Sequence, residues 1–310
     1  MSGGVSGGVN RGGGVATGPA PAAAAWSDRT SAFTRARRAI ANRAVLGACY
    51  LAAGLVVLPL ALILGHLIAK GLPGLNLDFF LKMPKPVGEA GGGMANAIVG
   101  TLIIVGVAAA AALPIGIAAG VYLAEYGRGR FAALVRYTTD LLSGVPSIVV
   151  GVAAYGLVVV PMGRFSALAG SAALMILMLP TIIRSTEEIV RLVPQTYRHG
   201  ALALGAPRWK VTQQVVLPAA RAGIVTAGML AVARAAGETA PLLFTALGNR
   251  FWSLKLDAPM ASLPIFIYDY ARAPYDDWNR QAWTAALVLV LLVTLISGIL
   301  RLTVRRIQSP

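Results

Sequence analysis

Two oppositely charged residues stand inside one long apolar stretch of the sequence. Arg234 and Glu238 lie within the run 222–247, and their spacing of four places both on one face of a helix. A lone charge at the bilayer centre costs about 2.5–3.5 kcal/mol on insertion scales, so such residues normally face a bundle interior and mark a polar pathway. A structural ion pair that only holds helices together is the alternative. The Arg-before-Glu order, the less favourable one for such a pair, argues weakly against it.

The composition places this helix in a membrane protein. The chain has 310 residues, of which 57% are hydrophobic and 13% charged, with a mean hydropathy of +0.71. Soluble domains are about 25% charged, and several apolar runs are long enough to cross a bilayer as helices. We therefore expect an all-α polytopic membrane protein with six transmembrane helices near 44–69, 95–123, 137–160, 166–184, 222–247 and 282–300.

The positive charges predict how the chain is oriented. If the amino terminus is cytoplasmic, most of the 27 Lys and Arg residues fall on the inner side. Residues 1–43 then form a cytoplasmic tail, Gly/Ala-rich and disordered at first and basic towards its end. Residues 70–94 form an outer loop, and 303–310 a cytoplasmic end. The net charge of +15 is thereby explained without nucleic acid.

Other chemistries have little support. Cys49 has no partner in the chain, and the two histidines are too few to indicate a metal centre. The chain has no Gly-x4-Gly-Lys-Ser/Thr loop, so we do not expect it to hydrolyse ATP. Glu125 is interpreted as a boundary residue, and Asp140, near Arg136 in sequence, as part of an interfacial ion pair. Pro114 and Pro146 should kink their spans.

A polar segment before the fifth span has the pattern of two short helices joined by a sharp corner. The segment from Gln195 to Leu204 should form the first helix, which Gly205 ends. Pro207 should then open a second helix that runs to Leu217 and stops at Pro218. The two helices would project from the cytoplasmic face towards a partner. An interfacial loop that only carries positive charge is the alternative.

This pattern resembles the coupling loop of binding-protein-dependent ABC importer permeases, Glu-Ala-Ala-x3-Gly-x9-Ile-x-Leu-Pro. Gly205, Leu217 and Pro218 match in register, and Val215 stands for the Ile. The opening triplet reads His199-Gly200-Ala201 and lacks the family's carboxylate. In that family the loop docks into a groove of a cytoplasmic ATPase. The resemblance therefore implies that these residues couple the chain to ATP hydrolysis in a separate subunit.

Further segments are similar to the phosphate-permease branch of this family, PstA, above all GETAPLLFTAL over 237–247. The likeness extends from about residue 90 to residue 300. It implies a type I ABC importer permease fold with its core over 95–302 and the coupling loop over 195–218. It also implies a location in the inner, cytoplasmic membrane with both termini cytoplasmic, and no cofactor bound by this chain. The implied partners are a PstC-like sister permease, a PstB-like ATPase dimer that uses ATP, and a PstS-like external phosphate-binding protein.

The resemblance assigns Arg234, Glu238 and Thr239 to the substrate path. An Arg guanidinium matches phosphate oxygens bidentately. Glu238 would hold Arg234 in the absence of an anion and would weaken anion binding enough for release, and Thr239 would add a hydroxyl. Three alternatives remain: an ABC permease for sulfate, molybdate or another oxyanion, a secondary transporter or channel that works without ATP, and a membrane sensor of phosphate status.

Overall fold

The computed structural model describes residues 32–86, 89 and 91–308, and their regular structure is helical apart from one isolated bridge between Leu247 and Met260. The disorder predicted for 1–30 lies outside these residues. The chain divides into two compact units, 1–61 and 62–310. The helix α1 (Ala32–Gly71) contains the predicted first span, and the basic stretch before residue 44 is already part of this helix.

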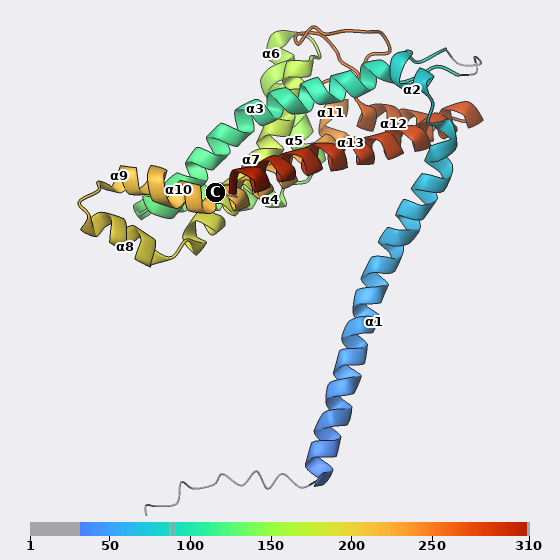
Figure 1. Ribbon diagram of the computed structural model, residues 1–310. Coiled ribbons are helices and arrows are strands. Elements are labelled where there is room, and N and C mark those ends of the chain that lie inside the picture. The colour runs from blue at the N-terminus through green and yellow to red at the C-terminus, as the bar shows by residue number, and fades with distance from the viewer. Residues whose placement is uncertain (1–31, 87–88, 90, 309–310) are drawn as a thin grey trace, which may run out of the picture. The chain divides into compact units, whose positions relative to one another are not determined.

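Most of the helices belong to the second unit (Figure 1). In chain order, the elements after α1 are η1 (Leu72–Gly74), α2 (Leu77–Leu81), α3 (Ala95–Glu125), α4 (Gly129–Gly144), α5 (Ser147–Ala154), the π-turn η2 (Tyr155–Val159), α6 (Val160–Met162), α7 (Ala167–Leu192), α8 (Gln195–Ala203), α9 (Arg208–Val211), the π-turn η3 (Thr212–Val216), α10 (Leu217–Ala236), α11 (Ala240–Leu243), α12 (Leu263–Ala271) and α13 (Asp276–Gln308). The predicted outer loop 70–94 thus contains a short helix, and α13 runs on into the predicted carboxyl-terminal end.

Five of the described helices are long and apolar enough to span a membrane, and a bent pair makes a sixth candidate. The five are Arg37–Gly74, Ala95–Glu125, Ala167–Leu192, Arg208–Ala236 and Asp276–Ile299. Length and hydropathy thus agree with the predicted polytopic, all-α membrane fold.

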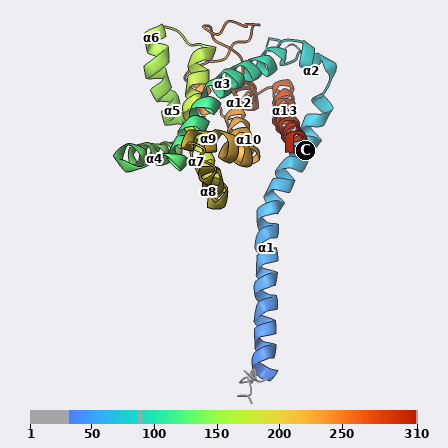
Figure 2. The same ribbon diagram turned by 60° about the vertical axis from the view of Figure 1, so that its left-hand side comes forward.

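The predicted third span, 137–160, is wrong as a single rod. It consists of α4 followed by α5 to α6, and these two pieces meet at 109°, so that α4 lies across the base of α5 in Figure 2. The break falls at Val145, whose extended backbone (φ −73°, ψ 130°) is the conformation that a following proline imposes. Pro146 therefore turns the chain sharply, whereas α3 continues through Pro114.

Close helix contacts through glycine build the core. A Cβ at Gly116 would lie 2.7 Å from the Ile182 side chain, and one at Gly120 would lie 2.7 Å from the carbonyl oxygen of Ile183. Such small residues let α3 and α7 approach closely, which stabilises helix pairs in lipid. The contacts move forward along both helices, from Gly116 against Ile182 to Gly120 against Thr186, so α3 and α7 run in the same direction.

The helix after the polar segment does not stop at Pro218, contrary to prediction. It continues from α9 through the π-turn Thr212–Val216 into α10. Proline inside a regular α-helix clashes with the carbonyl four residues back and lacks the N–H that would bond to it. The wider π-turn just before Pro218 displaces those carbonyls and lets the helix pass.

Candidate functional site

The fifth membrane-spanning segment is two helical pieces and not one helix as predicted. α10 ends at Ala236, where the Gly237 and Glu238 N–H groups donate to the carbonyls of Arg234 (3.1 Å) and Ala235 (3.2 Å). After the break at 237–239, α11 starts with Pro241 in its first turn. Proline would clash with a continuous helix here, and Gly237 adds the weak helix propensity of glycine.

This break lies about halfway along the neighbouring helix α7. Gly223 of α10 packs against Ile189, near the carboxyl end of α7, and Arg234 follows about 16 Å further along α10 at 1.5 Å per residue. α7 has 26 residues and is therefore about 39 Å long. Beyond the break, the Thr245 carbonyl accepts from the Ser166 N–H at the start of α7 (3.0 Å). The charged residues thus lie level with the middle of α7.

Arg234 and Glu238 lie together at this level. The Arg234 Nε is 3.8 Å from Glu238 Oε1, and the two side chains are 65% and 18% exposed. Thr239 follows and is half-buried. Among the described residues, the Arg234 guanidinium has no other polar partner. An exposed charge in a spanning segment is costly in hydrocarbon, so we expect it to face an aqueous path or another chain.

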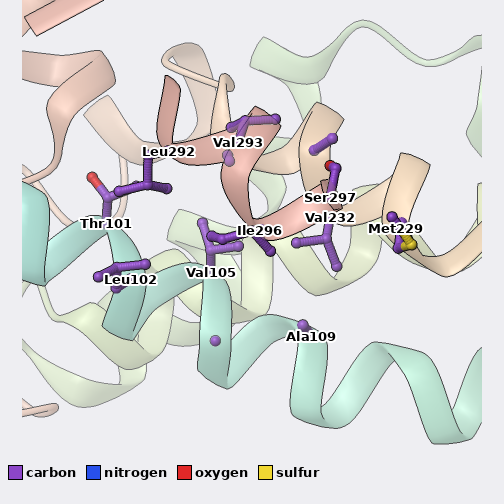
Figure 3. Close-up of a pocket in the computed structure, with 13 residues that line it drawn as sticks. Thr101, Leu102, Val105, Ala109, Met229, Val232, Leu292, Val293, Ile296 and Ser297 are labelled. Carbon is purple, nitrogen blue, oxygen red and sulfur yellow. The ribbon is translucent and has the colours of Figure 1, made fainter. Parts of the chain in front are cut away.

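A separate pocket of about 180 Å³ lies between α3, α10 and α13. Figure 3 shows that carbon atoms line almost all of it. Thr101 and Ser297 contribute its polar side chains, and the Thr101 hydroxyl is already occupied, since it donates to Ala97 O (2.8 Å) and accepts from Leu263 N (2.8 Å). Neither Arg234 nor Glu238 lines this pocket. Its surface offers an anion no charge, so it is not a candidate for the polar pathway.

The predicted corner between two short helices is present within 195–218, a segment that we call the elbow, and this corner has a specific geometry. α8 ends at Ala203, and Gly205 just beyond it has a left-handed backbone (φ +81°) that glycine adopts without strain. The Gly205 N–H donates to Leu202 O (2.9 Å) and the Ala206 N–H to Ala201 O (3.2 Å). These two bonds form a Schellman motif, which satisfies the last carbonyls of the helix. Pro207 then precedes α9.

The other residues predicted at the elbow fall on two faces. His199, Gly200, Gly205 and Pro218 are exposed. Ala201, Val215 and Leu217 are half-buried and pack against the core formed by Val190, Val193, Val211, Val216, Ala220 and Ile224. The apolar positions of the pattern therefore anchor the elbow to the bundle.

The outer surface of the elbow is apolar and basic. Leu204 is 90% and Trp209 56% exposed, and Arg208 and Lys210 beside them are exposed as well. The segment 195–218 contains no Asp or Glu. Large exposed apolar side chains next to charges are typical of a protein docking surface.

A buried ion pair fixes the elbow to the bundle, and no local pattern in the sequence indicates it. Arg198 Nη2 lies 2.7 Å from Glu125 Oε1, and the two side chains are only 10% and 13% exposed. Arg198 also donates to the carbonyls of Val190 (2.9 Å) and Val193. One guanidinium thus joins α8 to the ends of α3 and α7. Glu125 is therefore more than the boundary residue that we expected.

A second buried carboxylate lies nearby. Glu187 accepts from Arg136 Nε (2.7 Å) and Arg191 Nη2 (2.5 Å). Asp140 forms an ion pair as predicted, but its partner is Arg184 of α7 (3.6 Å) and not the nearby Arg136, which pairs with Glu187. The two pairs hold α4 against α7.

Aromatic rings gather at the opposite end of the bundle. Tyr270 is stacked on Trp278 with 4.3 Å between centroids, and Arg250 lies 5.0 Å from the Trp278 ring. Burial raises the pKa of the Tyr270 hydroxyl, which has no hydrogen-bond partner among the described residues. The pKa of the Asp269 carboxyl is raised as well, because the effect of burial exceeds the opposing effect of Arg250 and Arg272.

Known proteins share both the sequence and the fold. The model of the family described as "Binding-protein-dependent transport system inner membrane component" matches residues 112–309. The chain is 43% identical over 262 residues to the phosphate transport system permease protein PstA of Haemophilus influenzae, covering 84% of this chain and 93% of that protein. It is 48% identical over 233 residues to PstA of Xylella fastidiosa, with coverages of 74% and 81%.

A solved structure, an inward facing conformation of the MetNI methionine ABC transporter, matches with a TM-score of 0.57 and 21% identity. The match covers 68% of this chain and 94% of that one, and at this identity it shows a shared fold.

Proposed function

The chain belongs to the family of binding-protein-dependent transport system inner membrane components, and we propose that it is the permease subunit of an ATP-driven inorganic phosphate importer. The observation that carries this proposal is the exposed Arg234 guanidinium beside Glu238, at a break in a spanning helix and level with the middle of α7. Broken helices at the midplane are a common way to build a solute site in a membrane. The phosphate permeases that the chain resembles give the solute its identity.

Arg234, Glu238 and Thr239 have the chemistry that a phosphate path needs. The guanidinium offers several N–H donors in one plane and stays charged at any physiological pH. Glu238 lies at the outer limit of ion-pair distance, so it holds the guanidinium without occupying all its donors. The negative charge of Glu238 repels an anion and keeps its affinity low, so that the anion can be released again.

The elbow supports coupling to a separate ATPase. It projects from the ends of α7 and α10, and Leu204 and Trp209 at its surface offer an apolar contact. His199, Gly200, Ala201, Gly205, Val215, Leu217 and Pro218 shape this elbow or line its surface. ATP would be bound and hydrolysed in the partner, since the chain has no Gly-x4-Gly-Lys-Ser/Thr loop.

Further subunits would complete the transporter. The exposed Arg234 requires a second wall around the path, which a PstC-like sister permease would supply. A PstS-like binding protein would deliver phosphate from outside, and a PstB-like ATPase dimer would bind the elbow. The distribution of Lys and Arg supports a cytoplasmic position for the elbow and both termini. The membrane would be the inner, cytoplasmic membrane.

Uptake of 32P-phosphate by proteoliposomes that hold this chain with its co-expressed partners tests the proposal. Uptake should require ATP and be insensitive to excess sulfate. Inhibition by sulfate would point to another oxyanion, and uptake without ATP would point to a secondary transporter. ATP-dependent binding of phosphate without any uptake would favour the alternative of a membrane sensor of phosphate status.

Variants at Arg234 test the site itself. Arg234→Gln removes the charge-assisted contacts, each worth about 1.5–3 kcal/mol, so phosphate uptake should fall by at least tenfold. Arg234→Lys keeps the charge but loses the planar fork, so its uptake should lie between that of the wild type and that of Arg234→Gln. Co-purification of the partners checks that the complex still assembles. Wild-type uptake by Arg234→Gln would remove this residue from the path.

A further inference from the structure

A basic pocket lies behind the elbow, away from Arg234. It holds about 450 Å³ between the end of α3, the start of α8 and α9, and its charged lining consists of Glu125, Arg128, Arg191, Arg198 and Arg208. Arg191 is near the end of α7, about 20 Å along that helix from the level of Arg234. The pocket is thus distinct from the proposed transport path.

The pocket has more positive charge than its carboxylates balance. Arg198 is paired with Glu125, and Arg191 shares Glu187 with Arg136. Arg128 and Arg208 have no ion-pair partner among the described residues. Guanidinium groups that converge on one cavity repel one another, and an oxyanion among them relieves this repulsion.

Further polar side chains complete the lining. Gln195 and His199 border the cavity, and so do the hydroxyls of Tyr126 and Thr212, which lie 3.1 Å apart. The Thr212 hydroxyl donates to Arg208 O (3.1 Å), so the two hydroxyl protons are already used. The Arg guanidinium forks and the Gln195 amide are therefore the donors open to a phosphate group. The volume lies within the usual range for small-molecule sites.

We propose that this pocket binds a phosphate group at the base of the elbow. An anion held by both Arg208 and Arg128 would link α9 of the elbow to the turn between α3 and α4. The phosphate group has two possible sources: free inorganic phosphate, or the headgroup of an anionic phospholipid, since the pocket lies at the end of the spanning helices. The proposal rests on the proposed function only in taking this end to be cytoplasmic.

Phosphate binding by a variant that lacks the transport residue tests the pocket alone. The full chain carrying Arg234→Gln is reconstituted in nanodiscs of pure phosphatidylcholine, and the Kd for 32P-phosphate is measured. Adding Arg128→Gln and Arg208→Gln should weaken binding about a hundredfold, roughly tenfold for each lost charged contact. The matched control adds Arg130→Gln, in the first turn of α4 next to Arg128, and Lys210→Gln in α9; these remove the same charge, but neither residue lines the pocket. The control should bind like its parent.

A second arm distinguishes the lipid source. The unfolding temperature of the same three proteins is measured with and without phosphatidylglycerol in the nanodiscs. If free phosphate does not bind but phosphatidylglycerol stabilises the parent and the control more than the pocket variant, the phosphate group comes from the lipid. Equal behaviour of the pocket variant and the control in both arms overturns the proposal. Unfolding temperatures without ligand show that both variants are folded. Because the parent lacks the proposed transport residue Arg234, this result is independent of the uptake experiment.

Discussion

Alanine substitutions at Gly205 and Gly200 should have opposite effects on the elbow helix α8. At both glycines, a Cβ would have no other atom within 4 Å, so packing does not distinguish the two substitutions. Gly205 has a φ of +81°, whereas Gly200 lies inside α8 and is not among the residues with positive φ. Backbone conformation is therefore the difference between the two variants.

The size of the difference follows from known backbone preferences. An alanine held in the left-handed conformation costs roughly 1–2 kcal/mol. Alanine in place of glycine inside a helix stabilises it by about 0.5–1 kcal/mol. The two variants should thus differ by roughly 1.5–3 kcal/mol in the stability of the last turn of α8, which is a factor of about ten to a hundred in its opening equilibrium.

Hydrogen–deuterium exchange in nanodiscs measures this opening directly. The informative amides are those of Leu204 and Ala206, which donate to Gly200 O and Ala201 O. They should exchange faster than wild type in Gly205→Ala and more slowly in Gly200→Ala. Equal exchange in the two variants, or the reverse order, would refute the left-handed corner. If the elbow couples ATP hydrolysis to uptake, Gly205→Ala should also lower the phosphate imported per ATP.

Three further substitutions test how the bundle is held. Arg198→Ala leaves the buried Glu125 carboxylate unpaired and should destabilise the protein by about 3–5 kcal/mol. Adding Glu125→Gln should restore part of the unfolding temperature, and no recovery would contradict the pairing. Tyr270→Phe removes a buried hydroxyl that has no partner among the described residues, so the unfolding temperature should stay the same or rise, and a clear fall would reveal a bond to that hydroxyl. Gly120→Ala should cost about 1–3 kcal/mol because its Cβ would meet the backbone of α7. Gly106→Ala, in open space on the same helix, should not destabilise, so equal losses in both glycine variants would argue against the close contact of α3 and α7.

The features that the sequence predicted well are those with local signals. Apolar runs marked the spanning helices, and Gly205 followed by Pro207 marked the corner of the elbow. A left-handed helix end and a proline at a helix start depend on the residues in place and little on the rest of the fold.

The features that the sequence did not predict depend on tertiary contacts. Proline signals were visible at Pro146 and Pro218, but one produced a 109° bend and the other only a π-turn. The local sequence does not decide between these outcomes, because neighbouring helices determine which freed backbone groups find partners. The pair Arg198–Glu125 joins residues 73 apart, and charges at the ends of spans are too common to identify one pair.

The break at 237–239 changes what Arg234 can do. In an unbroken helix, Glu238 would lie one turn after Arg234, and the aligned backbone dipoles would continue past both residues. Instead, α10 ends there with Arg234 in its last turn, where the partial negative charge of a helix end favours a cation. Glu238 and this helix end both reduce the positive potential that Arg234 presents to an anion. An anion at Arg234 would therefore be bound weakly by this chain alone, so we expect the sister permease to supply the further donors that a phosphate ion needs to leave water.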